Sequence, residues 1–115
     1  MSKPVGPYTP IVKAGPWLVS SGQVGIADGA IVDGGFEAEF RQALANLQAL
    51  FEGEGSSLSA ITKTTVFLTD MDDYAEMNRI YMEVFGDHRP ARSAVAVAQL
   101  PVGAMVEIEA SAYVG

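Results

Sequence analysis

Two segments with helical periodicity, each lying between stretches of β-forming residues, constrain the fold of this chain most. Apolar side chains recur at helical spacing across residues 36–52 and form a wide stripe. A second stripe crosses residues 74–85, after an acidic start in which Asp73 and Glu76 have capping-box spacing. Glycines follow both segments, as is typical of helix ends. An amphipathic helix must bury its apolar stripe, so we expect both helices to pack against a sheet.

β-forming residues supply that sheet, and strands are predicted over residues 17–23, 61–68, 92–98 and 106–114. Asp28-Gly29 lies between two short apolar segments, which indicates a two-residue hairpin. The short loop 100–103 predicts that the last two strands are antiparallel neighbours. This order of elements predicts an α+β fold, a mixed sheet with two helices packed on one face. Residues 1–115 are expected to form a single domain.

The second face of the sheet carries charged side chains. In the last predicted strand, Glu107 and Glu109 alternate with apolar residues and lie on the face away from the helices. We place Arg92 on that same face. A sandwich of two layers leaves this face half apolar in water, so we expect further copies of the chain to cover it.

Fourteen acidic residues against seven basic ones give the chain a net charge of −7. This charge opposes binding to nucleic-acid phosphates, so no nucleic-acid partner is predicted. The only local basic cluster is His88-Arg89 with Arg92, and it allows a specific anion pocket within the acidic chain. His88 is the single histidine and there is no cysteine, so the sequence predicts no metal site.

Neither a membrane segment nor a secretory leader is visible. No apolar run approaches the roughly 20 residues that a membrane helix needs. The first ten residues are rich in Pro and Gly and have no apolar core. We therefore expect a cytoplasmic protein with no membrane partner.

Arg92 is the most informative single residue, because it opens a stretch that otherwise resembles a buried strand. An unpaired guanidinium is costly to bury. Ala94, Ala96 and Ala98 follow it at alternate positions and leave room beside it for a planar carboxylate held by two hydrogen bonds. The alternative is an internal salt bridge between Arg92 and Glu107 or Glu109, and the pattern leaves both possibilities open.

Other candidate residues carry weaker signals. Ser21-Gly22-Gln23 lacks the glycine pattern of a nucleophile elbow, and no histidine base is evident nearby, so a serine nucleophile is not predicted. Tyr8 lies in the turn Gly6-Pro7-Tyr8, where it covers the core or supplies a hydroxyl to a pocket. Asn78 interrupts the apolar stripe of the second helix, and its amide either caps a loop or reaches a neighbouring subunit.

A family resemblance extends over nearly the whole chain and rests on short segments that stand in a fixed order. These segments are Gly6-Pro7-Tyr8, Val19-Ser20-Ser21-Gly22-Gln23, Arg41-Gln42-Ala43-Leu44 with Asn46-Leu47, Gly55-Ser56-Ser57-Leu58, Lys63-Thr64-Thr65-Val66-Phe67-Leu68, Asn78 with Tyr81 and Phe85, Pro90-Ala91-Arg92-Ser93, Leu100-Pro101 and Glu107-Ile108-Glu109-Ala110. With all of them in order, the chain resembles the RidA (YjgF) family.

The resemblance implies a chorismate-mutase-like α+β fold, assembled as a homotrimer with sites in clefts between subunits. It also implies an enzyme that hydrolyses reactive 2-imino acids or their enamine tautomers, such as 2-iminobutanoate and 2-iminopropanoate, to 2-keto acids and ammonia. No metal or organic cofactor is implied. The expected partners are the imino or keto acid and further copies of the chain.

The same resemblance assigns roles to residues of this sequence. It places the arginine that binds the substrate carboxylate at Arg92, and the acidic residue near the reacting water at Glu107. It places the pocket tyrosine at Tyr8 and has the backbone of Ser21 and Gly22 line the same cleft. The catalytic pair implied is thus Arg92 and Glu107.

Four positions depart from the pattern common among deaminases of this family. Ala94 stands where cysteine is frequent, Ala96 where an acidic residue is frequent, and Gln99 and Val102 where basic residues are common. These changes alter the volume and charge near Arg92 and favour a larger or more apolar substrate. An alternative is a non-catalytic trimer in which Arg92 binds a small carboxylate as a sensor, but the retained Glu107 favours the deaminase.

Overall fold

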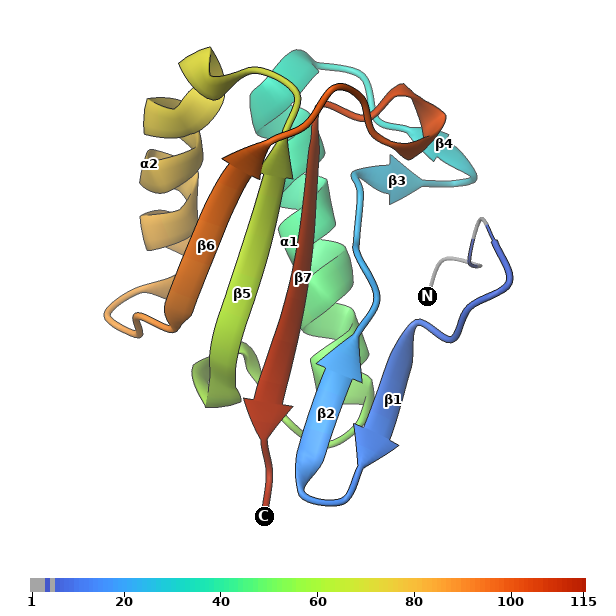
Figure 1. Cartoon of the computed structure of the whole chain (residues 1–115), viewed down its shortest axis with the longest axis vertical. Helices are drawn as coiled ribbons and strands as arrows, with labels where there is room; N and C mark the ends of the chain where they lie inside the picture. Colours follow the sequence, from blue (N-terminus) through green and yellow to red (C-terminus); the bar gives the residue numbers. More distant parts are fainter. Residues whose placement is uncertain (1–3, 5) are drawn as a thin grey trace.

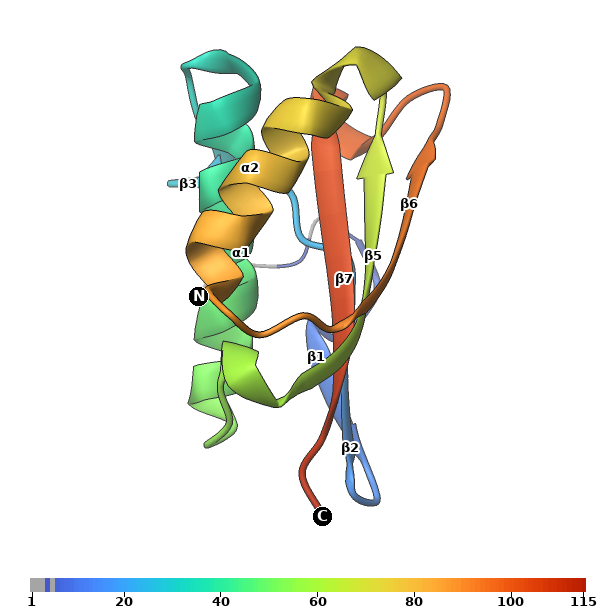
Figure 2. The same ribbon diagram turned by 90° about the vertical axis from the view of Figure 1, so that its left-hand side faces the viewer.

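The computed structural model describes residues 4 and 6–115, and its main feature is a five-stranded mixed sheet covered on one face by two helices (Figure 1). Along the sheet the strands stand in the order β1 (Ile11–Ala14), β2 (Trp17–Ser20), β7 (Val106–Tyr113), β5 (Ile61–Leu68) and β6 (Ala91–Ala96). The side view shows α1 (Gly35–Gly53) and α2 (Tyr74–Phe85) on the same side of this sheet (Figure 2). The predicted α+β architecture is therefore confirmed.

Both helices form where the sequence periodicity predicts them, because each buries one apolar stripe against the sheet. The core lies between the two layers and includes these fully buried side chains: Phe40, Leu44, Leu47 and Phe51 of α1, Met77 and Ile80 of α2, and Val66, Leu68 and Ile108 of the sheet. Burying a side chain of this size contributes roughly 1.5–3 kcal/mol. This shared core fixes the helices over the sheet.

The start of α2 differs in detail from the predicted capping box. Asp73 makes no side-chain cap hydrogen bond. The 3-10 turn η2 (Met71–Asp73) leads directly into the helix, and Asp70 accepts from the backbone N–H of Asp72 at 2.8 Å. Asp73 already has helical backbone angles, so it is not placed as a capping residue. Asp70 instead caps the 3-10 turn that precedes the helix, because its side chain accepts from the N–H of Asp72.

The predicted hairpin is confirmed, and one further hairpin was missed. β3 (Ile26–Ala27) and β4 (Ala30–Ile31) pair across Asp28 and Gly29, which both have positive φ as a type I′ turn requires. β1 and β2 form a second two-residue hairpin, in which Gly15 has φ 59°. Proline-rich sequence precedes β1 and hid this four-residue edge strand.

The predicted pairing of the last two strands is wrong. β6 pairs in parallel with β5, and β7 pairs antiparallel with β5, so β5 separates them. The connection β5–α2–β6 is a parallel crossover that returns the chain to the same end of the sheet (Figure 1). The short loop, with η3 (Pro101–Gly103), therefore spans β5 rather than closing a hairpin.

The face of the sheet away from the helices carries no helix among the described residues, and it is partly apolar. Val12, Val19 and Val95 lie on this open face and are 47%, 46% and 44% exposed. Trp17 and Tyr113 lie on it too, with their rings in edge-to-face contact at 5.3 Å. Such a patch is typical of a surface that another chain covers.

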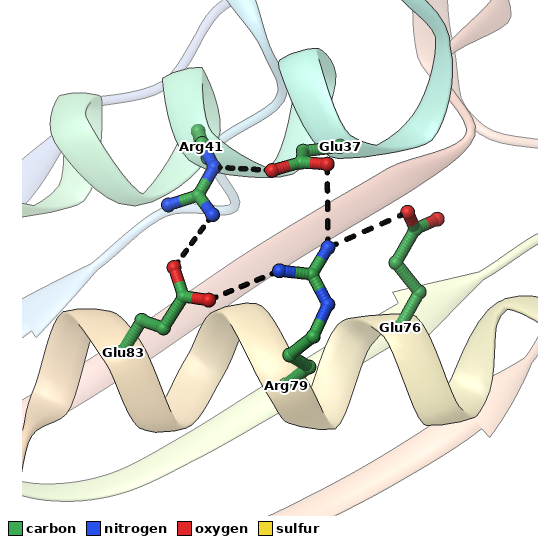
Figure 3. A network of polar contacts seen from close by, with 5 residues as sticks. All are labelled: Glu37, Arg41, Glu76, Arg79 and Glu83. Atoms are coloured by element: carbon green, nitrogen blue, oxygen red, sulfur yellow. Dashed lines mark hydrogen bonds and ion pairs between the residues drawn. The ribbon is translucent and has the colours of Figure 1, made fainter.

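On the outer surface, α1 and α2 are joined by a network of ion pairs (Figure 3). Arg41 contacts Glu37 at 2.9 Å and Glu83 at 2.6 Å. Arg79 contacts Glu83 at 3.0 Å, Glu37 at 3.2 Å and Glu76 at 3.7 Å. Each guanidinium thus has at least two carboxylate partners. In the described part of the chain, neither helix is long and apolar enough to cross a bilayer.

Candidate functional site

Arg92 lies in a hollow beside α2, which we call the arginine hollow and which is lined by Asn78, Tyr81, Met82, Arg89, Pro90 and Arg92. Its volume is about 390 Å³. Strand β6 brings Arg92 to this place, and the last turns of α2 supply the opposite wall. The hollow is therefore built where the β5–α2–β6 crossover ends.

The side chain of Arg92 is held by two tyrosines of α2. Its Nη2 donates to the hydroxyl of Tyr74 at 3.1 Å. Its guanidinium carbon lies 5.0 Å from the ring centre of Tyr81 and 5.6 Å from that of Tyr74, within cation–π range. The Tyr81 hydroxyl is in turn hydrogen-bonded to that of Thr64 at 2.8 Å. The guanidinium is thus oriented by aromatic groups.

Arg92 points to the helix side of the sheet, so its predicted place on the open face is wrong. Its register partner on β5 is Thr64, which is fully buried beneath the helices. Glu107 and Glu109 pair with Phe67 and Thr65 and therefore point to the other face. The error arose because the pattern of β6 alone does not reveal its register with β5. The internal salt bridge to either glutamate is excluded by this geometry.

Glu107 lies in a separate hollow, the glutamate hollow, lined by Tyr8, Ser21, Gly22, Val24, Pro101 and Glu107. Four predicted site residues, Tyr8, Ser21, Gly22 and Glu107, are brought together here. The isolated bridge between Gln23 and Ile108 draws the segment after β2 against the start of β7. Backbone bonds between these two residues, at 2.7 and 3.0 Å, fix that approach.

The carboxyl group of Glu107 is half-buried, and its environment favours the protonated form. Burial raises the pKa of Glu107, and the nearby charge of Glu109 raises it further. A carboxylate with a raised pKa is a better proton acceptor at neutral pH than an ordinary surface glutamate. Glu107 is therefore suited to take a proton from water.

Gly22 allows the Glu107 carboxylate to lie directly against the backbone. A Cβ placed on Gly22 would lie 2.4 Å from Oε2 of Glu107 and 2.6 Å from its Cδ. Any larger residue would push the carboxylate away. The need for glycine here comes from this close contact.

Ser21 is a structural part of the glutamate hollow. Its Oγ donates to the carbonyl of Thr9 at 2.7 Å, and its N–H donates to the carbonyl of Pro10 at 2.8 Å. The one histidine, His88, has Nε2 2.7 Å from the carbonyl of Ile61, so it is not placed as a base for Ser21. These contacts tie the segment that carries Tyr8 to the end of β2.

The four departures noted in the sequence do not line the arginine hollow. Ala94 packs against the hydrophobic core beneath the helices. Val102 is exposed beside Pro101 and has φ 54°, which is strained for a β-branched residue. Among the described residues, no group of three potential ligands could hold a metal ion.

The structure adds residues that the sequence analysis did not select as site residues. Arg89 and Asn78 both line the arginine hollow, and the Oδ1 atom of Asn78 is buried without a hydrogen-bond partner in the described part of the chain. In the sequence, Arg89 belonged to the basic cluster and Asn78 interrupted the apolar stripe of the second helix. Their shared location depends on the crossover, which the sequence did not predict.

Comparisons with known proteins give a consistent result over nearly the full chain. A family model described as endoribonuclease L-PSP matches residues 1–114. A RutC family protein of Pyrococcus horikoshii is 47% identical, over 96% of this chain and 90% of that protein. A mouse protein named 2-iminobutanoate/2-iminopropanoate deaminase is 42% identical, over 96% and 84%. The crystal structure of RidA from an Antarctic Psychrobacter matches with a TM-score of 0.93 at 38% identity, over 96% and 91%.

Proposed function

The chain belongs to the RidA family, whose model is described as endoribonuclease L-PSP, and on this premise we propose that it hydrolyses 2-imino acids to 2-keto acids and ammonia. The reaction takes place in clefts between the subunits of a homotrimer. Relatives that carry the deaminase name support the reaction class. The substrates would include 2-iminobutanoate and 2-iminopropanoate, or their enamine tautomers.

One observation carries this proposal: the chain holds two incomplete half-sites on opposite faces of its sheet. The arginine hollow has cations without a carboxylate, and the glutamate hollow has a carboxylate without a cation. Both statements concern the ion pairs and lining residues among residues 4 and 6–115. Contact between two chains can join the halves, and the open apolar face supports such contact. In each cleft, Arg92 of one chain would face Tyr8, Ser21, Gly22 and Glu107 of its neighbour.

Arg92 binds the substrate carboxylate in this cleft. A guanidinium presents parallel N–H groups that match the two oxygens of a carboxylate. The hydrogen bond to Tyr74 and the contact with the Tyr81 ring already restrict the guanidinium, so little side-chain freedom is lost when the substrate binds. Fixing the carboxylate also fixes the imine carbon beside it, which converts a random encounter with water into a positioned one.

Glu107 handles the protons of the reaction. It takes one proton from water as the water oxygen bonds to the imine carbon, and it passes this proton to nitrogen, giving a carbinolamine. The hydroxyl proton then moves by the same route as the C–N bond breaks. One water is consumed, one ammonia leaves, the carbonyl of the keto acid forms, and Glu107 returns as a carboxylate. General base catalysis of this kind contributes about 10²–10⁴-fold.

A nuclease activity, which the family description names, is less well supported by this chain. The net charge of −7 repels a phosphate backbone. Its one histidine is bonded to the carbonyl of Ile61 and lines neither hollow. The two arginines of the arginine hollow suit a small anion better than a long polyanion.

The test is the release of 2-ketobutyrate from 2-iminobutanoate generated by an amino acid oxidase, in buffer low in free amines and against the spontaneous rate. The native protein should accelerate release, and Arg92→Ala and Glu107→Gln should each remove most of the acceleration. Arg41→Ala, which removes an arginine of the surface network, should keep it. If a folded native assembly gives no acceleration but is stabilised against heat by keto acids, the protein is a carboxylate-binding module instead.

A further inference from the structure

The arginine hollow contains two guanidinium groups. Arg89 and Arg92 both line it, and neither forms an ion pair with a carboxylate of the described residues. Nη1 of Arg89 donates to the backbone carbonyl of Gly86, and to that of His88 at 3.1 Å. Arg92 donates to a tyrosine hydroxyl. Both cations are thus held by neutral groups.

This arrangement is unusual for a chain that has twice as many acidic residues as basic ones. The other two arginines, Arg41 and Arg79, each contact at least two glutamates on the helix surface. Carboxylates are therefore available to arginines elsewhere, whereas none of the described residues that line the hollow carries one. Two like charges in one hollow repel each other, and an anionic ligand with two charges removes that repulsion.

Tyr81 lies within electrostatic range of both cations. Burial raises the pKa of Tyr81, while its hydrogen bond with Thr64 and the charges of Arg92 and Arg89 lower it. Both guanidinium groups are therefore close enough to influence the same phenol. Tyr81 lines the same hollow as both arginines.

Arg89 is also held in place by its local sequence. Pro90 follows it and restricts the backbone of Arg89 to extended conformations. The two carbonyl contacts come from the turn that ends α2 at Gly86. The hollow is also lined by the apolar side chains of Pro90 and of Met82 in α2, which suit a short methylene chain. The hollow thus offers two cationic positions and an apolar wall.

We infer that this site selects 2-imino dicarboxylic acids, with Arg92 binding the carboxylate beside the imine carbon and Arg89 binding the carboxylate at the far end. The inference rests on the proposed deaminase function and names its substrate class. Arg89 is in this view a specificity-determining residue, and the bond-making steps at the imine carbon are unchanged. A substrate of this kind must be supplied by a reaction that oxidises the amino group of an acidic amino acid with transfer of two electrons to an acceptor, or that eliminates water from a β-hydroxylated acidic amino acid.

The experiment compares two imino acids generated in situ, 2-iminoglutarate with two carboxylates and 2-iminobutanoate with one. The quantity measured is the ratio of their kcat/KM values. In the native protein this ratio should favour 2-iminoglutarate. Arg89→Met should lower the ratio about 10- to 100-fold, the size expected for a lost charge-assisted hydrogen bond, and Arg89→Lys should restore part of it. Lys13→Met, which removes one positive charge from strand β1, should leave the ratio unchanged.

A second measurement needs no turnover. Binding of 2-oxoglutarate and 2-oxobutyrate to the native protein and to Arg89→Met is followed by calorimetry, with circular dichroism to confirm folding. Tighter binding of 2-oxoglutarate that depends on Arg89 supports the inference even if neither imine is hydrolysed, in which case only the deaminase function fails. If imines are hydrolysed but Arg89→Met changes neither the ratio of kcat/KM values nor the binding preference, the inference is overturned and the deaminase function remains.

Discussion

The ion network on the helices and the pair of hollows use the same charged residue types in opposite ways. On the helix surface, Arg41 and Arg79 alternate with glutamates so that every guanidinium touches at least two carboxylates (Figure 3). Like charges stand together at the hollows: Arg89 and Arg92 both line the arginine hollow, and Glu109 lies near enough to Glu107 of the glutamate hollow to raise its pKa. The first region pairs its charges within the chain, whereas these four residues of the second form no ion pair with another described residue.

The carboxyl groups of the two regions respond to pH with opposite signs. A hydrogen bond from Arg41 lowers the pKa of both Glu37 and Glu83, so their contribution to stability is present above the ordinary glutamate pKa and is lost as the pH falls through the lowered value. Burial raises the pKa of Glu107, so its ionisation costs stability as the pH rises through the raised value. A group that weakens the fold in its charged form is better explained by function than by stability.

The largest predicted effect comes from replacing a guanidinium by an ammonium in each region. Arg92→Lys keeps the charge and loses the two-pronged geometry, so kcat/KM for imine hydrolysis should fall about 100-fold. Arg41→Lys, in the surface network, should leave activity and thermal stability almost unchanged because that pair is exposed and screened by solvent. Steady-state kinetics and thermal unfolding on the two variants check this.

Equal activity in both lysine variants would show that Arg92 acts only as a positive charge. In that case the hydrogen bonds to the substrate carboxylate would have to come from another group of the cleft.

A smaller effect is expected from two glycine substitutions that separate function from folding. Gly22→Ala should lower kcat/KM about tenfold, because its methyl group displaces the flexible end of Glu107 while the fold adjusts easily. Gly25→Ala places a methyl group 2.5 Å from the backbone carbonyl oxygen of Glu39 in α1 and should cost about 1–3 kcal/mol of stability. Urea unfolding and kinetics on both variants measure the two effects. A Gly22→Ala protein with full activity would remove Glu107 from its proposed place.

The smallest predicted effect concerns the like-charged glutamates. Glu109→Gln removes the neighbouring charge that raises the pKa of Glu107, which leaves burial as the cause that remains. The pKa of Glu107 should then fall, so the acid limb of kcat/KM should move to lower pH while the rate at neutral pH stays the same. A pH–rate profile of the variant against the native protein tests this. A shift to higher pH would contradict Glu107 as the base.

Local features of this fold were predictable from the sequence, and pairings over long distances were not. The two apolar stripes and the Asp28-Gly29 pair depend only on residues close together in the sequence, and they predicted the two helices and the hairpin. The position of β6 beside β5, by contrast, is set by the crossover through α2 and by core packing. That one error carried Arg92 to the wrong face of the sheet, because a residue's face depends on the register of its strand.

The candidate site shows the same difference between what the sequence predicts and what depends on long-range packing. Tyr8, Ser21, Gly22 and Glu107 lie together in the glutamate hollow, next to the bridge between Gln23 and Ile108, and their roles stay predictions from the family resemblance. Arg89 and Asn78 were noticed only as a basic cluster and as a break in a stripe. Their chemistry becomes visible once the end of α2 and the start of β6 meet. Whether Arg92 joins the glutamate hollow stays a prediction about assembly.

The opposite orientations of Arg92 and Glu107 also have a genetic consequence. In the proposed assembly each chain borders two clefts, and it lends its arginine side to one and its glutamate side to the other. An allele that damages the residues of one side leaves those of the other side functional in the cleft shared with the neighbouring chain. Two different defective alleles expressed together can therefore restore one another in part, although neither encodes a working protein by itself.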